Sequence, residues 1–344
     1  MKALWTESAG VVRYGDLPDP SPEKGWVKIR ILAASICGSD LKTYKYGRPY
    51  KLEQRVSGHE FVGVIEEVAN DASVWKVGQR VCVYPQLFCG VCDDCKAGRI
   101  NMCKERKYIG GKDFNGGFAE YAVVPEVCLM EVPETVSDIE AAMTEPFAVG
   151  LHAVNQAGGA ALKGKSVVIY GAGPIGLFAL EGAKFYGVKQ IIMLDMVPEK
   201  LQIAKAHGAT DVILAKDEPE VLQEKVLQLT GGKGVDAVID AVCLDVSIDN
   251  AMHFCKPHGI ISVVGLTKTN CMVDFQYLIR NQLQLIGAYT YTTEMQECLK
   301  ILGSGKTSTA YIADPIAPLC EGIETFRKLV EQPAECLKAV FVPN

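Results

Sequence analysis

The stretch that decides the fold is KSVVIYGAGPIG, at residues 165–176. An apolar run leads directly into Gly171, Gly173 and Gly176, and the segment that follows, LFALEGAKFYG, has apolar spacing typical of a helix. Strand, glycine turn and helix is the order that binds a dinucleotide. The first glycine permits the tight turn, the second lets the backbone approach a pyrophosphate, and the third lets helix and strand pack closely. The helix amino terminus would supply N–H groups for that anion.

The next predicted strand supports the same interpretation. It reads QIIMLD and ends in Asp195, nineteen positions after Gly176. A carboxylate there accepts hydrogen bonds from the adenosine ribose and repels a 2′-phosphate, which favours NAD over NADP. A cap on the strand end is the simpler role for such an aspartate, but its register with the glycines favours the cofactor role. The predicted cofactor-binding residues are Gly171, Gly173, Pro174, Ile175, Gly176, Asp195 and Lys200.

Further apolar segments continue the alternation of strand and helix. They lie at residues 211–215, 236–242, 259–266 and 283–289, and amphipathic stretches such as PEKLQIAKAHG lie between some of them. Short apolar strands that alternate with helices specify a parallel sheet with helices on both faces. We therefore predict an α/β fold with a six-stranded, doubly wound parallel sheet of the Rossmann type, at about residues 151–290.

The first 150 residues have a different character and contain a cysteine cluster. Short apolar segments separated by Gly, Pro and Asp turns predict a mainly β domain. Within it, CGVCDDCKAGRINMC has the form C-x2-C-x2-C-x7-C, and four thiolates on a short loop can enclose one Zn²⁺ tetrahedrally. An iron–sulfur cluster is the chemical alternative. A single cluster beside a nucleotide site favours structural zinc, with the predicted ligands Cys89, Cys92, Cys95 and Cys103.

Composition excludes several classes of protein. A chain of 344 residues exceeds what one core usually supports, so two domains are expected. The formal net charge of −6 offers no attraction to nucleic acid or to anionic membranes. The amino terminus lacks an apolar signal core, and no uncharged run has the length of a membrane span. We expect a soluble cytoplasmic protein whose thirteen cysteines are reduced, some of them bound to metal.

The order of motifs along nearly the whole chain resembles one family. CGSD, GHEFVG, the four-cysteine loop, GGFAEYAVV, EPFAVGLHA and GAGPIG occur in the order found in zinc-dependent medium-chain dehydrogenases. Within that family the chain looks most like the polyol branch, which includes the sorbitol and galactitol-1-phosphate 5-dehydrogenases. The resemblance implies a GroES-like catalytic domain at residues 1–150 that is completed by residues 291–344. It also implies an active site in the cleft between the domains.

The same resemblance implies a second zinc, which spacing alone does not reveal. Cys37, His59 and Glu145 match the positions of the catalytic zinc ligands, and three protein ligands leave a fourth position for an alcohol. Glu60 matches a carboxylate that approaches this zinc directly or through water, so which of the two glutamates contacts the metal stays open. Asp40 matches the carboxylate that orients the imidazole, and Ser39 matches the hydroxyl that takes the substrate's proton.

One departure from the family pattern concerns the proton relay. Many members have a histidine five positions after the catalytic cysteine, and this chain has Lys42 there. Lys42 also belongs to the basic stretch DLKTYKYGRPYK, with Lys45, Arg48 and Lys51. A solvated basic loop is the ordinary interpretation of such a run. The alternative is that Lys42 and Arg48 attract an anionic substrate such as a polyol phosphate.

These observations predict an enzyme. We expect an oxidoreductase with two zinc ions per chain that transfers a hydride between NAD and a secondary alcohol of a polyol, a sugar alcohol or its phosphate. Oxidation of an amino-acid alcohol, as in the threonine dehydrogenases, is the enzymatic alternative. A catalytically silent nucleotide-binding relative is the non-enzymatic one, and it is disfavoured because no predicted ligand is missing. The expected partners are a small-molecule substrate and further copies of the chain, in a homodimer or homotetramer, without nucleic acid or membrane.

Overall fold

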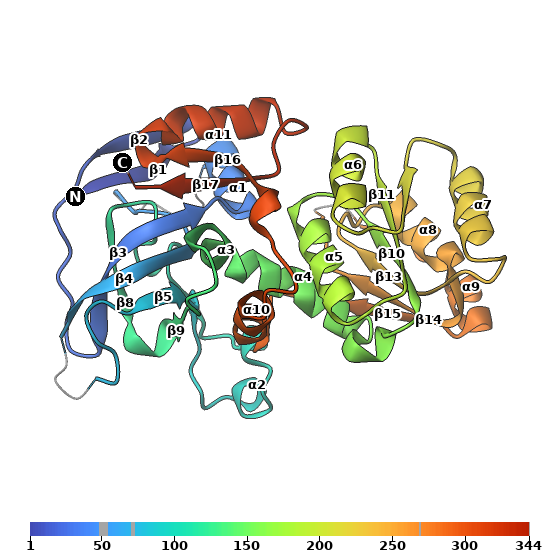
Figure 1. Cartoon of the computed structure of the whole chain (residues 1–344), viewed down its shortest axis with the longest axis horizontal. Coiled ribbons are helices and arrows are strands. Elements are labelled where there is room, and N and C mark those ends of the chain that lie inside the picture. Colours follow the sequence, from blue (N-terminus) through green and yellow to red (C-terminus); the bar gives the residue numbers. More distant parts are fainter. Residues whose placement is uncertain (48–53, 70–72, 268–269, 344) are drawn as a thin grey trace. The chain divides into compact units, whose positions relative to one another are not determined.

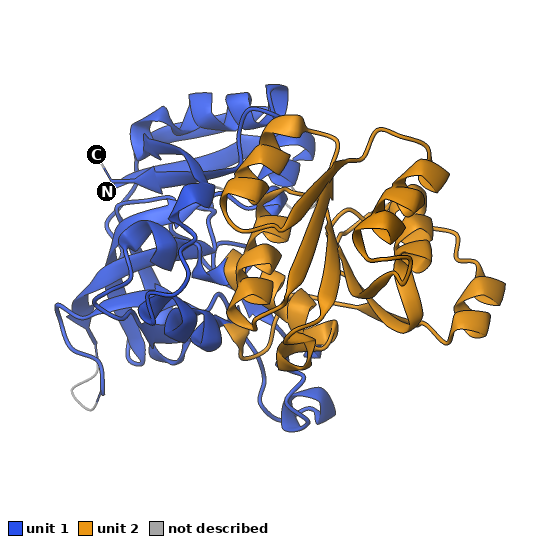
Figure 2. Cartoon of the chain, turned by 45° about the vertical axis from the view of Figure 1, so that its right-hand side comes forward, with its two compact units in different colours: residues 1–145, 295–344 blue, residues 146–294 orange. Residues whose placement is uncertain are grey.

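A computed structural model describes residues 1–47, 54–69, 73–267 and 270–343 (Figure 1). The chain divides into unit 1, Met1–Glu145 with Met295–Asn344, and unit 2, Pro146–Glu294 (Figure 2). The sequence predicts these crossings after residues 150 and 290. The first crossing comes earlier because Phe147 already belongs to the core of unit 2, where its ring stacks on Phe178 with centroids 5.8 Å apart.

Unit 2 contains a six-stranded parallel sheet in the order β12-β11-β10-β13-β14-β15. Helices α5 and α6 lie on one side of it, and α7, α8 and α9 lie on the other (Figure 1). This order and layering confirm the predicted doubly wound sheet. The strands are β10 (Ser166–Tyr170), β11 (Gln190–Asp195), β12 (Asp211–Leu214), β13 (Val235–Asp240), β14 (Cys255–Val263) and β15 (Gln284–Gly287). The helices are α4 (Thr144–Gln156), α5 (Pro174–Phe185), α6 (Pro198–Ala206), α7 (Pro219–Leu229), α8 (Asp245–Phe254) and α9 (Phe275–Asn281).

The central strands of unit 2 are uniformly apolar because both faces of the sheet are covered. Val167, Val168 and Ile169 of β10 are all fully buried, as are Ala237, Val238 and Ile239 of β13. A parallel sheet between two helix layers requires such unbroken runs, whereas a sheet with one wet face would show alternation. The burial of these apolar side chains therefore stabilises the sheet whose strand β10 leads into the glycine turn.

Unit 1 is built on a seven-stranded sheet in the order β16-β17-β3-β4-β5-β9, with β8 paired to β3. Its strands are β3 (Trp26–Ser35), β4 (Glu60–Val68), β5 (Arg80–Val83), β8 (Tyr121–Pro125), β9 (Leu129–Glu131), β16 (Ala313–Pro318) and β17 (Lys338–Val342). A smaller sheet joins β1 (Lys2–Ser8) and β2 (Val11–Asp16). The helices include α1 (Gly38–Tyr46), α3 (Asp138–Ala142), α10 (Glu294–Gly303) and α11 (Gly322–Glu331).

The end of the chain returns to complete unit 1. Strand β17 pairs antiparallel with β3, which places Val340 opposite Ser35. Phe341 packs edge-on against Phe118 with ring centroids 5.4 Å apart, so the two distant segments share one core. This is the mainly β domain that the sequence predicts. Among the described residues, no helix has both the length and the apolarity needed to cross a bilayer.

Candidate metal centres and cofactor site

Cys37 lies in unit 1 at the junction of β3 and α1, where it caps the helix. Its Sγ accepts the backbone N–H of Ser39 at 3.5 Å, and its own N–H donates to Oδ2 of Asp40 at 2.9 Å. The first turn of a helix favours negative charge, so this position suits a thiolate. Strand β4 begins at Glu60 and pairs with β3 through Ser35, which brings the preceding residue, His59, to the same end of the sheet.

Three potential ligands converge at this point. The ligand atoms of Cys37, His59 and Glu60 all lie within 4.8 Å of one another. Glu145 lies outside that group, in the first turn of α4, where only 8% of the residue is exposed. A thiolate, an imidazole and a carboxylate form a donor set that suits zinc with an open position.

The charges of this group favour a cation. Burial disfavours a charged imidazole, but the negative charges of Cys37, Asp40 and Glu145 raise the pKa of His59 well above its ordinary value. The surroundings thus stabilise positive charge between the thiol and the carboxylates. A divalent metal supplies that positive charge while binding a neutral imidazole, so the residues fit zinc. Burial raises the pKa of Asp40, and the attraction of His59 acts in the opposite direction.

Glu60 has two buried partners that sequence reasoning missed. Lys338 of β17 donates from Nζ to Oε1 of Glu60 at 2.8 Å, and the Ser35 hydroxyl donates to Oε2. Burial opposes the charge of Lys338, but Glu60 and Cys37 outweigh it and raise the pKa of that lysine. The one signal in the sequence is a lysine inside the apolar stretch LKAVFV, where a strand-forming pattern makes a buried cation unusual.

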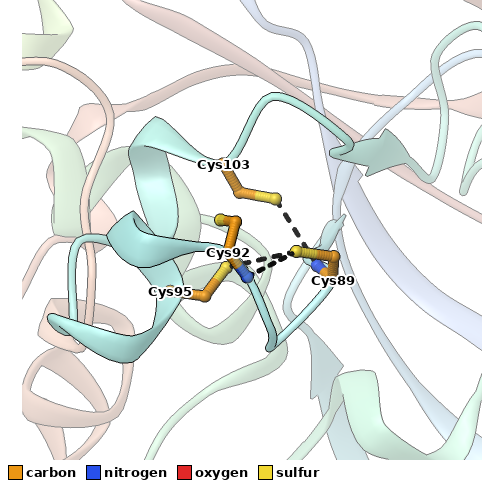
Figure 3. A group of neighbouring side chains, drawn as sticks. All are labelled: Cys89, Cys92, Cys95 and Cys103. Carbon is orange, nitrogen blue, oxygen red and sulfur yellow. Dashed lines mark hydrogen bonds between the residues drawn. The ribbon is translucent and has the colours of Figure 1, made fainter.

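The second predicted centre is a small lobe of unit 1. Strands β6 (Gln86–Leu87) and β7 (Lys107–Tyr108) pair at its base, and α2 (Asp93–Lys96) lies between them in the chain. The thiols of Cys89, Cys92, Cys95 and Cys103 point toward one another (Figure 3), with all four sulfur atoms within 4.8 Å. The structure thus brings the predicted cluster together.

Backbone N–H groups already stabilise negative charge in this lobe. Cys92 donates to Sγ of Cys89 at 3.4 Å, and Cys89 donates to Sγ of Cys103 at 3.5 Å. Donation from Val91 and Cys92 lowers the pKa of Cys89 to about 6. Desolvation and the neighbouring thiols raise the pKa of Cys95 to about 12. Four thiolates this close repel one another without a cation, and Zn²⁺ binding would remove their remaining protons.

The glycine turn of unit 2 has the shape that the motif predicts. Gly171 has φ 101°, which favours glycine, and a Cβ on Gly176 would lie 1.8 Å from the carbonyl oxygen of Gly171. Gly173 caps α5, and a Cβ there would meet nothing within 4 Å. Pro174 and Ile175 form the first turn of α5, where no side chain caps the helix. An open backbone at a helix amino terminus fits a pyrophosphate.

Asp195 lies at the end of β11 and accepts a hydrogen bond from the backbone of this turn. Its Oδ2 accepts the N–H of Ala172 at 2.6 Å, and its Oδ1 accepts the N–H of Val197 at 2.8 Å. Each carboxylate oxygen has a second lone pair, so capping the turn leaves capacity for ribose hydroxyls. Lys200 lies nearby in the chain, on α6.

A buried carboxylate at the end of β13 also escaped sequence reasoning. Oδ1 of Asp240 accepts the N–H groups of Val242 and Cys243 at 2.8 and 3.0 Å, and Oδ2 accepts the Ser247 hydroxyl at 2.8 Å. Burial raises its pKa, while those hydrogen bonds oppose the shift. Asp240 thereby fixes the turn that follows β13. The signal in the sequence is an aspartate that ends an apolar strand.

The remaining predicted residues lie near Cys37 in sequence. Ser39 and Lys42 are exposed on α1, three positions apart, which places them on neighbouring parts of one helix face. Arg48, predicted with Lys42 to contact an anionic substrate, lies outside the described residues, as does Lys51.

Two protein families match the chain. Residues 23–134 match the alcohol dehydrogenase GroES-like domain, and residues 174–304 match the zinc-binding dehydrogenase family. Sorbitol dehydrogenase from Bacillus subtilis (strain 168) is 30% identical over 100% of this chain and 98% of its own length.

Solved structures agree with these matches. Galactitol-1-phosphate dehydrogenase from Escherichia coli superposes with a TM-score of 0.90 at 26% identity, over 100% of both chains. An alcohol dehydrogenase from Escherichia coli CFT073, complexed with the cofactor NADH, superposes with a TM-score of 0.90 at 28% identity, over 99% of both chains.

Proposed function

The chain belongs to the zinc-binding dehydrogenases with an alcohol dehydrogenase GroES-like domain, and from this we propose that it oxidises a polyol or sugar alcohol with NAD. The reaction interconverts a secondary alcohol and a ketone, and the substrate is a free polyol or its phosphate. One observation carries the proposal: Cys37, His59 and a glutamate converge in unit 1 of a chain whose unit 2 presents an open glycine turn. The sorbitol and galactitol-1-phosphate dehydrogenases among its relatives support the substrate class.

The proposed residue roles follow from the donor set. Cys37 and His59 hold the catalytic zinc with Glu60 or Glu145, and Asp40 holds the Cys37 backbone in place. Zinc in that site supplies Lewis-acid chemistry, which makes the substrate hydroxyl more acidic. Ser39, exposed in the first turn of α1, takes the hydroxyl proton and passes it to water. The four cysteines of the lobe hold a second, structural zinc.

Unit 2 holds the cofactor in this proposal. The backbone of Gly171, Gly173 and Gly176 and the first turn of α5, with Pro174 and Ile175, receive the pyrophosphate. Asp195 accepts hydrogen bonds from the ribose hydroxyls and repels a 2′-phosphate, and Lys200 of α6 is proposed to contact the same ribose. The nicotinamide supplies hydride acceptance at C4. Asp195→Asn keeps an acceptor oxygen without the charge, so it should narrow the preference for NAD over NADP.

A substrate panel tests the proposal. Zinc-loaded protein and NAD are mixed with sorbitol, xylitol, galactitol 1-phosphate and L-idonate, and with threonine and ethanol as controls, while NADH absorbance is followed. Turnover of a polyol or its phosphate at a kcat/KM at least about tenfold above either control is expected. Turnover of threonine alone would replace the proposal with amino-acid alcohol oxidation.

Lys42 is proposed to attract the anionic group of a phosphorylated substrate. Lys42 is exposed about one helical turn after Ser39, whereas Nζ of Lys45 lies 5.5 Å from the centroid of the Tyr46 ring. Lys42→Ala should raise KM for a phosphorylated polyol and leave KM for the free polyol nearly unchanged, with Lys45→Ala as the matched control. Equal effects on both substrates would make the basic helix an ordinary solvated surface.

The chain is also proposed to form a homodimer through β15, the last strand in the described sheet of unit 2. Large apolar side chains on β15 and in the stretches of chain before and after it are exposed: Leu266, Met272, Phe275, Ile279, Leu285 and Tyr289. An exposed strand edge with apolar neighbours suits antiparallel pairing with a second copy about a twofold axis. Light scattering should show a dimer or a tetramer built from it, and Leu285→Lys should shift it toward monomer.

We propose that the protein is cytoplasmic, because a reducing compartment suits a chain whose cysteines, all among the described residues, form no disulfide in this structure.

A further inference from the structure

Two cysteines outside both proposed metal centres lie together in unit 2. Cys243 follows β13, and Cys271 lies after β14 in the described segment that begins at residue 270. The thiol of Cys271 donates to the carbonyl oxygen of Cys243 at 3.8 Å, and the side chains of both residues are partly exposed. Neither cysteine belongs to the groups of potential metal ligands found among the described residues.

One hydrogen bond and one close approach of the backbones hold the two segments together. The N–H of Met272 donates to Oδ1 of Asp245 at 2.7 Å, which ties the residue after Cys271 to the start of α8. On the other side, a Cβ on Gly265 would lie 2.8 Å from the backbone nitrogen of Cys243. These contacts keep the two segments that carry the cysteines close together, as a disulfide requires.

The conformation of Cys243 is itself unusual. Its φ is 58°, in the left-handed region that glycine adopts readily and other residues adopt at a cost of about 1 kcal/mol or more. Burial first, and then the neighbouring Cys271 and Asp240, raise the pKa of the Cys243 thiol, so its sulfur is the second of the two to react. A cysteine kept in a strained turn, beside a second cysteine, points to a role for its sulfur.

We propose that Cys243 and Cys271 form a reversible disulfide that weakens cofactor binding. Hydrogen peroxide is the oxidant: the sulfur of Cys271 attacks a peroxide oxygen to give a sulfenic acid and water. The second sulfur then displaces a second water as the S–S bond forms. Two thiols are oxidised and one peroxide is reduced to two waters. Two molecules of reduced glutathione restore the thiols by successive exchange and leave as oxidised glutathione.

The consequence for the cofactor comes from the position of the pair. Both cysteines follow the carboxyl ends of parallel strands, β13 and β14, and dinucleotides bind beyond that edge of such a sheet. Closing the sulfurs to bonding distance draws the segment at Cys271 onto the turn at Cys243. This effect rests on the proposed cofactor site, whereas the formation of the disulfide does not.

The first arm of the test detects the bond. Zinc-loaded protein is treated with peroxide, alkylated and digested with trypsin without reduction. The peptide at residues 269–280, which carries Cys271, should become linked to that at residues 234–268. Fragment spectra must assign the bond to Cys243, because Cys255 lies in the same peptide. Cys320→Ser, which removes an exposed thiol of unit 1, should still form the bond, and Cys271→Ser should not.

The second arm measures NADH affinity by fluorescence. Oxidation should weaken NADH binding by wild-type protein about tenfold. Because coupling between two equilibria is reciprocal, a saturating concentration of NADH should shift the disulfide equilibrium in glutathione buffers about tenfold toward the reduced thiols. Oxidised Cys271→Ser should bind NADH as its reduced form does. Absence of the linked peptide, a linked protein with unchanged affinity, or an equal loss in Cys271→Ser would overturn the proposal. If reduced wild-type protein fails to bind NADH, the proposed function is wrong. The linked peptide would still test the formation of the disulfide independently.

Discussion

Lys338 and Glu60 are separated by 278 residues in sequence, yet Nζ of the lysine lies 2.8 Å from the carboxylate. Both side chains are almost fully buried, at 6% and 1% exposure. The lysine places a positive charge against Glu60, whose carboxylate lies beside the predicted ligands Cys37 and His59. It also ties the last strand of the chain to the start of β4.

Lys338→Met should therefore be strongly destabilising, because it leaves a buried carboxylate without its cation. The expected loss in the free energy of unfolding is about 3–5 kcal/mol. Arg30→Met removes the exposed ion pair with Glu66 and should cost no more than about 1 kcal/mol. Urea unfolding monitored by fluorescence checks both values, and a Lys338→Met loss as small as that of Arg30→Met would contradict the account. Adding Glu60→Gln to Lys338→Met should restore part of the stability.

Glu294 should make the free energy of unfolding depend on pH. Burial opposes its ionisation, but the hydrogen bond with His152 at 2.8 Å and the Thr292 N–H lower the pKa of Glu294 to about 2. Its contribution to stability should be complete above about pH 4.5 and be lost as the pH falls toward about 2. The difference in unfolding free energy between wild type and Glu294→Gln should shrink over that window. Glu220→Gln, at an exposed position in the first turn of α7, is the control. A wild-type minus Glu294→Gln difference that does not change with pH would contradict the assignment.

In the turn from β10 into α5, one glycine is needed for close packing and another for the approach of the cofactor. Gly176→Ala should lower stability by about 1–3 kcal/mol, because its methyl group would collide with the Gly171 carbonyl. Gly173 has φ −73° and open space around it, so Gly173→Ala should leave stability unchanged and weaken NADH binding. Thermal unfolding and NADH titration distinguish them. Unchanged NADH affinity in Gly173→Ala would contradict the pyrophosphate assignment.

The cysteine lobe should depend on its metal. Cys95→Ser should lower zinc from two ions to one per chain and reduce the unfolding temperature, since a closed thiolate site contributes to folding. Cys37→Ala should lose the other ion with little effect on the unfolding temperature, and Cys320→Ser should lose none. Metal analysis with thermal unfolding measures this. Full zinc content in Cys95→Ser would show that the lobe is not a zinc site.

Local features could be predicted from the sequence, and nonlocal ones could not. The glycine turn and the four cysteines each occupy a short stretch whose spacing reflects one geometry, and the strands of unit 2 are continuous apolar runs. The partners of Glu60 come from β3 and β17, and no pattern in the sequence pairs Lys338 with Glu60. Spacing also could not show that Glu60, rather than Glu145, lies within 4.8 Å of Cys37 and His59.

In the whole molecule, the proposed metal site and the proposed cofactor site belong to different units. The proposed metal ligands and the proposed proton acceptor Ser39 belong to unit 1, and the glycine turn and Asp195 belong to unit 2. Neither unit alone oxidises an alcohol. The central claim is that a hydride passes from the carbinol carbon of a polyol to NAD.

Isotope transfer tests that claim most directly. The polyol that reacts fastest in the panel is prepared with deuterium on the oxidised carbon and incubated with zinc-loaded protein and NAD, and the NADH formed is analysed by mass spectrometry. The account predicts one deuterium in each NADH, at C4 of the nicotinamide, and slower turnover where the transfer itself limits the rate. Cys37→Ala should form no labelled NADH. NADH without deuterium, or labelled NADH from Cys37→Ala at the wild-type rate, would contradict the account.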